Sequence, residues 1–227
     1  MFSAEKFGRA FEAEVYRYSL IFGTKITDLT LETLIVMTLE ALGLADQTEW
    51  EEGGHGAGKD ISLEEGKWRL SVKSGTENSK RLSISSFRTE SEGLETIDAK
   101  VDYFDGAGKN FTHYLVLSRE DQAPTKKRSK EQCVRTYRCR LIPADVVCAG
   151  GNREWTETHT KKGTFSGWTS NVVDGVKMTV AKKMSSQFWF SIELPALRNR
   201  PDVIELFELK IPFKDLRTRR YRMVESE

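Results

Sequence analysis

The residues best suited to chemistry in this sequence lie on two short runs of alternating apolar residues. Asp60 lies in the first run, residues 58–62, and Lys73 lies in the second, residues 68–75. The polar segment 64–67 between them is typical of a turn, so the pattern predicts a β-hairpin. An aspartate and a lysine then lie side by side on paired strands, and such a pair can hold a divalent metal.

Alternation within the second strand decides which side chains share a face. Ser71 and Lys73 are expected to point together toward Asp60, because side chains alternate between the two faces of a strand. An aspartate, a lysine on the adjacent strand and a glutamate from a helix form a recurring arrangement for phosphodiester hydrolysis. The carboxylates hold Mg²⁺, and the lysine stabilises charge on the phosphate or orients the attacking water. A hairpin with a surface ion pair has the same spacing, so both interpretations remain open here.

A helix is expected over residues 3–22. Phe7 and Phe11 belong to an apolar stripe at helical spacing, and Glu12 lies beside that stripe. By its pattern alone, Glu12 fits a solvated helix face better than a metal site.

These segments together resemble the PD-(D/E)xK nuclease signature, in which an aspartate precedes an acidic-x-lysine element. Residues 58–61 and 70–75 carry the resemblance, and residues 8–12 are similar to the first core helix of that superfamily, whose glutamate joins the metal site. Ser71 stands where the family usually has Glu or Asp. The second carboxylate must therefore come from elsewhere, with Glu12 as the first candidate and Glu51 or Glu52 next.

The resemblance implies a role for each of four residues. Asp60, Glu12 and Ser71 would contribute to a Mg²⁺ site, with Ser71 offering only its hydroxyl or its backbone carbonyl. Lys73 would stabilise the charge that develops on the phosphate. Asp60, Lys73, Glu12 and Ser71 are thus the expected catalytic residues.

The order of expected elements supports the same resemblance. A helix, three strands, a second helix near residues 94–104 and a buried strand over residues 111–119 follow one another as in the superfamily core. The resemblance covers about residues 3–120. It implies an α/β fold in one domain: a mixed sheet flanked by helices, with a restriction-endonuclease-like core in residues 1–148. A β-rich extension in residues 149–227 would complete the sheet and read DNA.

Charge is distributed unevenly along the chain. Residues 1–123 contain 14 Lys and Arg against 22 Asp and Glu, whereas residues 124–227 contain 21 against 12. A basic region is the electrostatic footprint of a polyanion binder, because each cation near a phosphate releases a condensed counterion. A solvated basic surface would give the same count.

Two segments of the basic half carry the expected DNA contacts. One is a Pro-containing polar loop near residues 122–130, and the other is the Gly-, Thr- and Asn-rich stretch 150–186, whose side chains suit reading of base edges. The second stretch would equally suit an irregular β-extension that packs its tryptophans. The expected contacts are Lys126, Lys127, Arg128 and Lys130 in the loop, and Lys161, Lys162, Trp168, Asn171, Lys182 and Lys183 in the later stretch.

Whole-chain properties limit the class of protein. With 227 residues, 38% hydrophobic and 30% charged, the chain can bury a core, and no apolar run reaches the ~18 residues of a membrane span. The amino end has no secretory pattern, so we expect a cytoplasmic protein without a membrane partner. Cys133, Cys139 and Cys148 form no C-x-x-C pair, which favours buried free thiols over a zinc site or disulfides.

The resemblance implies a Mg²⁺-dependent, sequence-specific double-stranded DNA endonuclease, most similar to a type II restriction enzyme. Such an enzyme would act as a homodimer on a palindromic site, with a cognate DNA methyltransferase in the host but not in the complex. Two alternatives remain at this point. One is a repair nuclease or Holliday junction resolvase, and the other is a non-catalytic DNA-binding protein on a decayed nuclease core, which the serine at position 71 keeps open.

Overall fold

The computed structural model describes residues 2–44, 48–49, 60–86, 94–122, 133–147, 150–182 and 187–216. Within them the helices are α1 (Ala4–Phe22), α2 (Asp28–Ala41), α3 (Ile97–Ala107) and α4 (Leu194–Arg198). The strands are β1 (Thr48–Glu49), β2 (Ile61–Leu63), β3 (Trp68–Glu77), β4 (Arg81–Ser85), β5 (His113–Asp121), β6 (Val134–Pro143), β7 (Trp155–His159), β8 (Phe165–Val173), β9 (Val176–Ala181), β10 (Phe188–Glu193) and β11 (Ile204–Pro212). Short 3-10 turns follow α3 and β6, at Gly108–Asn110 and Ala144–Val146.

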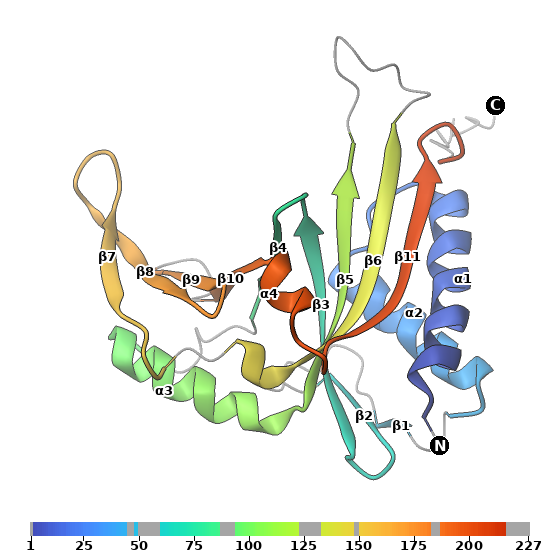
Figure 1. Cartoon of the computed structure of the whole chain (residues 1–227), viewed down its shortest axis with the longest axis horizontal. Coiled ribbons are helices and arrows are strands. Elements are labelled where there is room, and N and C mark those ends of the chain that lie inside the picture. Colours follow the sequence, from blue (N-terminus) through green and yellow to red (C-terminus); the bar gives the residue numbers. More distant parts are fainter. Residues whose placement is uncertain are drawn as a thin grey trace, which may run out of the picture.

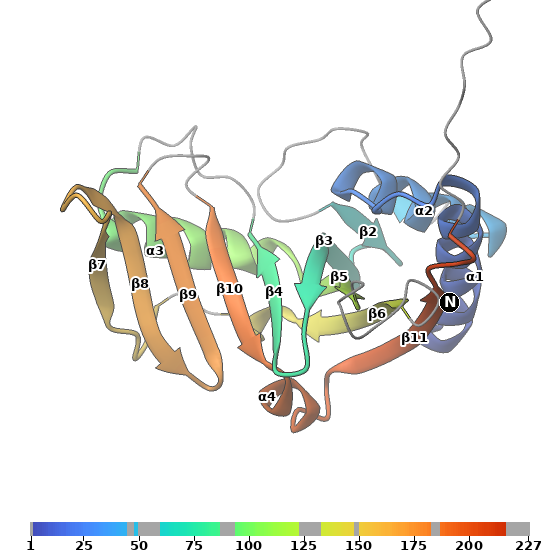
Figure 2. The ribbon, with the colours of Figure 1, turned by 90° about the horizontal axis from the view of Figure 1, so that it is seen from above.

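All these strands belong to one open, mostly antiparallel sheet, so the expected α/β class with helices flanking a mixed sheet is confirmed. Its order is β11-β6-β5-β3-β4-β10-β9-β8-β7, with β2 paired to β3 and β1 paired to β2. Among the described strands, β3 and β5 form the parallel pair. Figure 2 shows β7 to β10 and β4 as one row of strands, which turns at β3 toward β5, β6 and β11.

The turn of the sheet occurs where β3 and β4 approach most closely. β3 pairs with β4 over only three residues, Gly75 to Glu77. A Cβ on Gly75 would lie 2.8 Å from Ile84 Cγ2 and 3.0 Å from the Ser83 carbonyl oxygen. A side chain at position 75 would therefore push the two strands apart.

Helices α1 and α2 cover one face of the central strands. Phe7 and Phe11 of α1 are buried with Leu70 and Val72 of β3 in a single apolar cluster. Ser3 caps α1 by accepting a hydrogen bond from the Lys6 amide, as its position before the apolar stripe predicts. Figure 1 shows both helices gathered beside β5, β6 and β11.

Helix α3 lies on the other side, beneath the β7–β10 part of the sheet (Figure 1). Phe104 of α3 packs with Tyr114 and Val116 of β5 and with Phe190 of β10 in a second apolar cluster. The sheet thus separates two cores. Successive residues of β5 point alternately into one core or the other: Leu115 and Leu117 belong to the first cluster, and Tyr114 and Val116 belong to the second.

Thr96 caps the amino-terminal end of α3, and a substitution of Thr96 tests this capping role. Its hydroxyl accepts a hydrogen bond from the Ala99 amide at 3.2 Å. We expect Thr96→Ala to lower the free energy of unfolding by about 1 kcal/mol, because one first-turn amide loses its acceptor. Urea unfolding measures this. Thr27→Ala is the matched control, since Thr27 precedes α2 without a side-chain capping bond. Equal losses from both substitutions would contradict the capping role.

The carboxyl-terminal third of the chain divides between the two ends of the sheet. Strands β7 to β10 extend it beyond β4, whereas β11 returns to pair with β6 at the opposite edge. Phe188, Phe190 and Ile192 alternate along β10 and share its buried face.

Cys133 and Cys139 are buried free thiols, as expected, and burial raises the pKa of Cys139. Cys148 lies outside the described residues. No helix in the described part of the chain is both long and apolar enough to cross a membrane.

Candidate active site

The predicted hairpin is present and brings Asp60 to β3. Strands β2 and β3 pair antiparallel, with Ile61 opposite Leu70. The Asp60 amide donates to the Leu70 carbonyl at 2.9 Å, which extends the ladder by one residue and fixes the backbone of Asp60 against β3. The position of the Asp60 carboxylate therefore follows from strand register.

Three donors of β3 converge on one oxygen of the Asp60 carboxylate. The Val72 amide donates to Oδ2 at 2.6 Å, and the Ser71 hydroxyl and the Lys73 ammonium each lie 3.4 Å from the same atom. The side chains of Asp60 and Lys73 are only 16% and 14% exposed. Their attraction is therefore less screened than that of a surface ion pair. Three of the four residues predicted for catalysis are brought together here.

The other carboxylate oxygen, Oδ1, has no hydrogen-bond partner among the described residues. Such an oxygen can accept a cation or a water molecule. Mg²⁺ in proteins is commonly held by one or two carboxylates, with waters and substrate phosphates completing its shell. Asp60 could supply one such carboxylate.

Glu12 is not brought to this group, and its expected part in the metal site is not supported by the geometry. It follows Phe11 on α1, which packs with Leu70 and Val72. Ser71 and Lys73 alternate with those residues and point to the other face of the sheet. The sheet therefore stands between Glu12 and Asp60. Within the described ranges, no group of three His, Cys, Asp or Glu residues could hold a metal ion. Glu51 and Glu52 lie outside those ranges.

Glu77 is the carboxylate of β3 on the same face as Lys73, but it is engaged elsewhere. At ~3.3 Å per residue it lies about 13 Å along the strand from Lys73. Its side chain is 1% exposed and forms ion pairs with Arg140 at 2.5 Å and Arg138 at 3.1 Å. Ser118 also donates to it at 2.7 Å. Glu77 therefore cannot serve as the second carboxylate of the Asp60 site.

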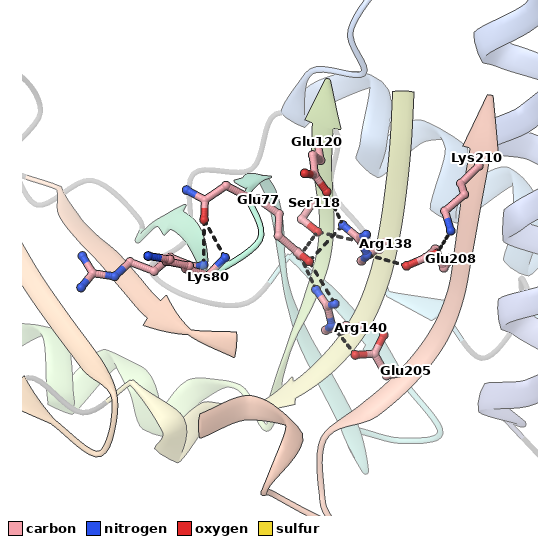
Figure 3. A network of polar contacts seen from close by, with 11 residues as sticks. Glu77, Lys80, Ser118, Glu120, Arg138, Arg140, Glu205, Glu208 and Lys210 are labelled. Carbon is pink, nitrogen blue, oxygen red and sulfur yellow. Dashed lines mark hydrogen bonds and ion pairs between the residues drawn. The ribbon is translucent and has the colours of Figure 1, made fainter. Parts of the chain in front are cut away.

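Around Glu77 the two arginines build a network across β3, β5, β6 and β11 (Figure 3). Arg140 donates to Glu205 at 2.6 Å, and Arg138 contacts Glu120 at 3.1 Å and Glu208 at 2.6 Å. Arg138 and Arg140 alternate along β6, so both lie on one face of the strand. Their carboxylate partners come from three other strands.

Tyr114 is a buried polar residue near the site that the sequence pattern did not single out. It lies opposite Ser71 in the parallel pairing of β3 with β5. Burial, together with the negative charges of Asp105 and Asp60, raises the pKa of its phenol far above the usual value. Its hydroxyl has no hydrogen-bond partner among the described residues. Only the strand pairing, which joins segments 43 residues apart, reveals this neighbour.

The residues expected to contact DNA are only partly described. Lys126, Lys127, Arg128, Lys130 and Lys183 lie outside the described ranges. Lys161 and Lys162 are exposed in the turn between β7 and β8. Lys182 lies over the Phe165 ring, 5.0 Å from its centroid, and Asn171 accepts a hydrogen bond from the Glu154 amide at 3.1 Å.

Trp168 requires a correction. Its side chain is 9% exposed and packs edge-on against Phe165 with a centroid distance of 4.8 Å. The indole belongs to the core beneath β8 and β9, so it is not placed to contact a base. Because the stretch around Trp168 is rich in glycine and threonine, its sequence does not indicate whether the indole is buried or exposed. Burial of Trp168 depends on the pairing of β8 with later strands.

Comparison with known proteins adds no family to this description. No protein-family model matches the chain, and neither the curated proteins nor the solved structures give a match.

Proposed function

We propose that this protein is a Mg²⁺-dependent endonuclease that hydrolyses phosphodiester bonds of double-stranded DNA. The observation that carries the proposal is the Asp60 carboxylate held against Lys73, 3.4 Å away, on paired strands. The β2–β3 hairpin is followed along the chain by β4, α3 and β5, and β5 is parallel to β3. This order of elements resembles that of a restriction-endonuclease-like core. The strands β7 to β10 form the β-rich extension of that core.

Each residue of the site would have a separate role. Asp60 would bind Mg²⁺ through Oδ1, while the Val72 amide and the Ser71 hydroxyl hold its other oxygen in place. Lys73 would stabilise the negative charge that develops on the phosphate. When bound, Mg²⁺ would supply Lewis-acid stabilisation of that charge. Water would attack phosphorus in line with the departing 3′ oxygen, without a covalent enzyme intermediate.

Because one such site cuts one strand, cleavage of both strands at a palindrome requires two copies related by a twofold axis. The proposal therefore includes a homodimer on DNA. The finer assignment, a type II restriction enzyme, rests on the resemblance and on the polar β-rich extension.

Lys161 and Lys162 offer a test of DNA contact by that extension. Both are exposed in the turn between β7 and β8. If each neutralises one phosphate, the double substitution to alanine should reduce the slope of log K against log salt by about 0.9 per lysine. Fluorescence anisotropy of labelled duplex over a salt series measures this. Lys6→Ala with Lys67→Ala is the charge-matched control, and an equal change of slope in that control would contradict the assignment.

Digestion of plasmid DNA with Mg²⁺ and with EDTA tests the proposed activity. Discrete fragments that appear only with Mg²⁺ support a sequence-specific endonuclease. Selective cutting of branched DNA would instead indicate a junction resolvase. Binding without cutting would indicate a DNA-binding protein on a decayed core, an alternative favoured by the single carboxylate found at the described site.

A further inference from the structure

A second candidate site lies on the face of β3 opposite Lys73. A cleft of about 380 Å³ opens between the segment that joins α1 to α2 and the strands β3, β4 and β10. Ser74 and Thr76 of β3 line it, and they alternate with Lys73 along the strand. The sheet therefore separates this cleft from the Asp60 site. Its volume falls in the range of small-molecule and cofactor sites.

The cleft is lined by polar groups from several elements. Ser83 and Ser85 of β4 lie beside Ser74 and Thr76 of β3, so four hydroxyl groups come from two adjacent strands. A hydroxyl group can both donate and accept hydrogen bonds. This lining suits a ligand that carries both donors and acceptors, such as a sugar or a heterocycle.

Positive charge is in excess around the cleft. Lys25 and Arg119 both line it. Lys25 has no acidic partner among the described residues. Arg119 shares Asp121 with Arg135, at 3.0 Å and 2.9 Å, so two guanidinium groups face one carboxylate. An anionic group at this end of the cleft would be attracted by the uncompensated charge.

An aromatic wall completes the cleft. Trp189 of β10 lines it and is 52% exposed, although neighbouring Phe188 and Phe190 are buried. An exposed indole beside cations and hydroxyls is a platform for a flat heterocycle.

We propose that this cleft binds a nucleotide unit, with the base on Trp189, the sugar and base edge on the Ser and Thr hydroxyls, and the phosphate near Lys25 and Arg119. The ligand is either a free nucleotide or a nucleotide of a single DNA strand. The proposal does not depend on the cleavage activity proposed for Asp60 and Lys73.

Isothermal titration of the full-length protein in EDTA tests this inference. The probes are the four deoxynucleoside 5′-monophosphates, inorganic phosphate and a single-stranded DNA octamer. At least one monophosphate or the octamer should bind with a submillimolar Kd, and inorganic phosphate should bind more weakly. Binding of the monophosphate indicates a free nucleotide as ligand. Binding of the octamer alone indicates a DNA strand.

Three variants connect the binding to the cleft. Trp189→Ala should weaken binding by about 5- to 150-fold through lost stacking, while Trp189→Phe, which keeps a ring, should retain most of it. Lys25→Ala should weaken binding, most strongly at low salt. Lys6→Ala, the same change at an exposed position of α1, should have no effect.

Absence of binding by every nucleotide probe, or binding unchanged in both Trp189→Ala and Lys25→Ala, would overturn the proposal. A Lys73→Ala protein that no longer cuts but still binds these probes would separate the two sites.

Discussion

Lys73→Ala is expected to lower the rate of Mg²⁺-dependent DNA cleavage by about 10²–10³-fold, the loss typical when one group that stabilises a developing charge is removed. The Lys73 ammonium lies 3.4 Å from the Asp60 carboxylate, and the Lys73 side chain is only 14% exposed. A cation from the solvent therefore cannot readily take the place of the lost ammonium group. Single-turnover digestion of plasmid DNA at saturating enzyme measures the rate. The fold should persist, because Asp60 keeps its bonds to the Val72 amide and the Ser71 hydroxyl.

Lys67→Ala is the matched control for this substitution. Lys67 lies in the turn of the same hairpin, six residues earlier, and its side chain is 67% exposed. The same change of charge near the same strands should leave the cleavage rate within about twofold, since surface substitutions have small effects. Normal cleavage by Lys73→Ala would remove Lys73 from the catalytic machinery. A large loss in Lys67→Ala would show that the effect is not local.

Glu77→Leu is expected to lower the free energy of unfolding by about 3–5 kcal/mol, because it leaves the buried Arg140 and the partly buried Arg138 without their shared carboxylate. Arg140 is 5% exposed and Glu77 is 1% exposed, so water cannot replace the lost partner. Arg138 loses a contact as well, although it keeps Glu120 and Glu208. Urea unfolding followed by circular dichroism measures the change.

Two further variants serve as comparisons for the stability of Glu77→Leu. Glu193→Gln breaks the exposed pair of Arg81 and Glu193 and should cost less than about 1 kcal/mol. The double variant Glu77→Leu, Arg140→Met should be more stable than Glu77→Leu, because it also removes the buried guanidinium that Glu77→Leu leaves with only the exposed Glu205 as its partner. A double variant less stable than either single variant would show that the penalty does not come from a buried guanidinium deprived of its buried carboxylate.

Local patterns were enough to predict the elements that hold the candidate site. Alternation over residues 68–75 correctly separated Leu70 and Val72 from Ser71 and Lys73, because period-2 burial is imposed by strand geometry whatever the partner strands are. The helical stripe containing Phe7 and Phe11 predicted α1 for the same reason. Asp60 could be placed against β3 because a short turn leaves an antiparallel hairpin as the simplest connection.

These local patterns could not predict which segments far apart in the sequence come into contact. Glu12 was expected to reach Asp60, yet α1 covers the other face of the sheet, and no local pattern indicates which face a helix covers. Tyr114 comes beside Ser71 only through a parallel pairing across the α3 connection. Trp168 is buried because β8 pairs with β9 and packs on the second core. Each of these outcomes depends on packing among segments far apart in the chain.

Digestion of supercoiled plasmid by wild-type protein and by Asp60→Asn, each with Mg²⁺ and with EDTA, tests the proposed endonuclease most directly. Asparagine keeps the size of the side chain but removes the charge that would hold the metal. Asp98→Asn, at an exposed position in the first turn of α3, is the control for the same chemical change. We predict discrete fragments from wild type and Asp98→Asn with Mg²⁺ only, and intact plasmid with Asp60→Asn. Cleavage by Asp60→Asn at the wild-type rate, or cleavage by wild type in EDTA, would contradict the account.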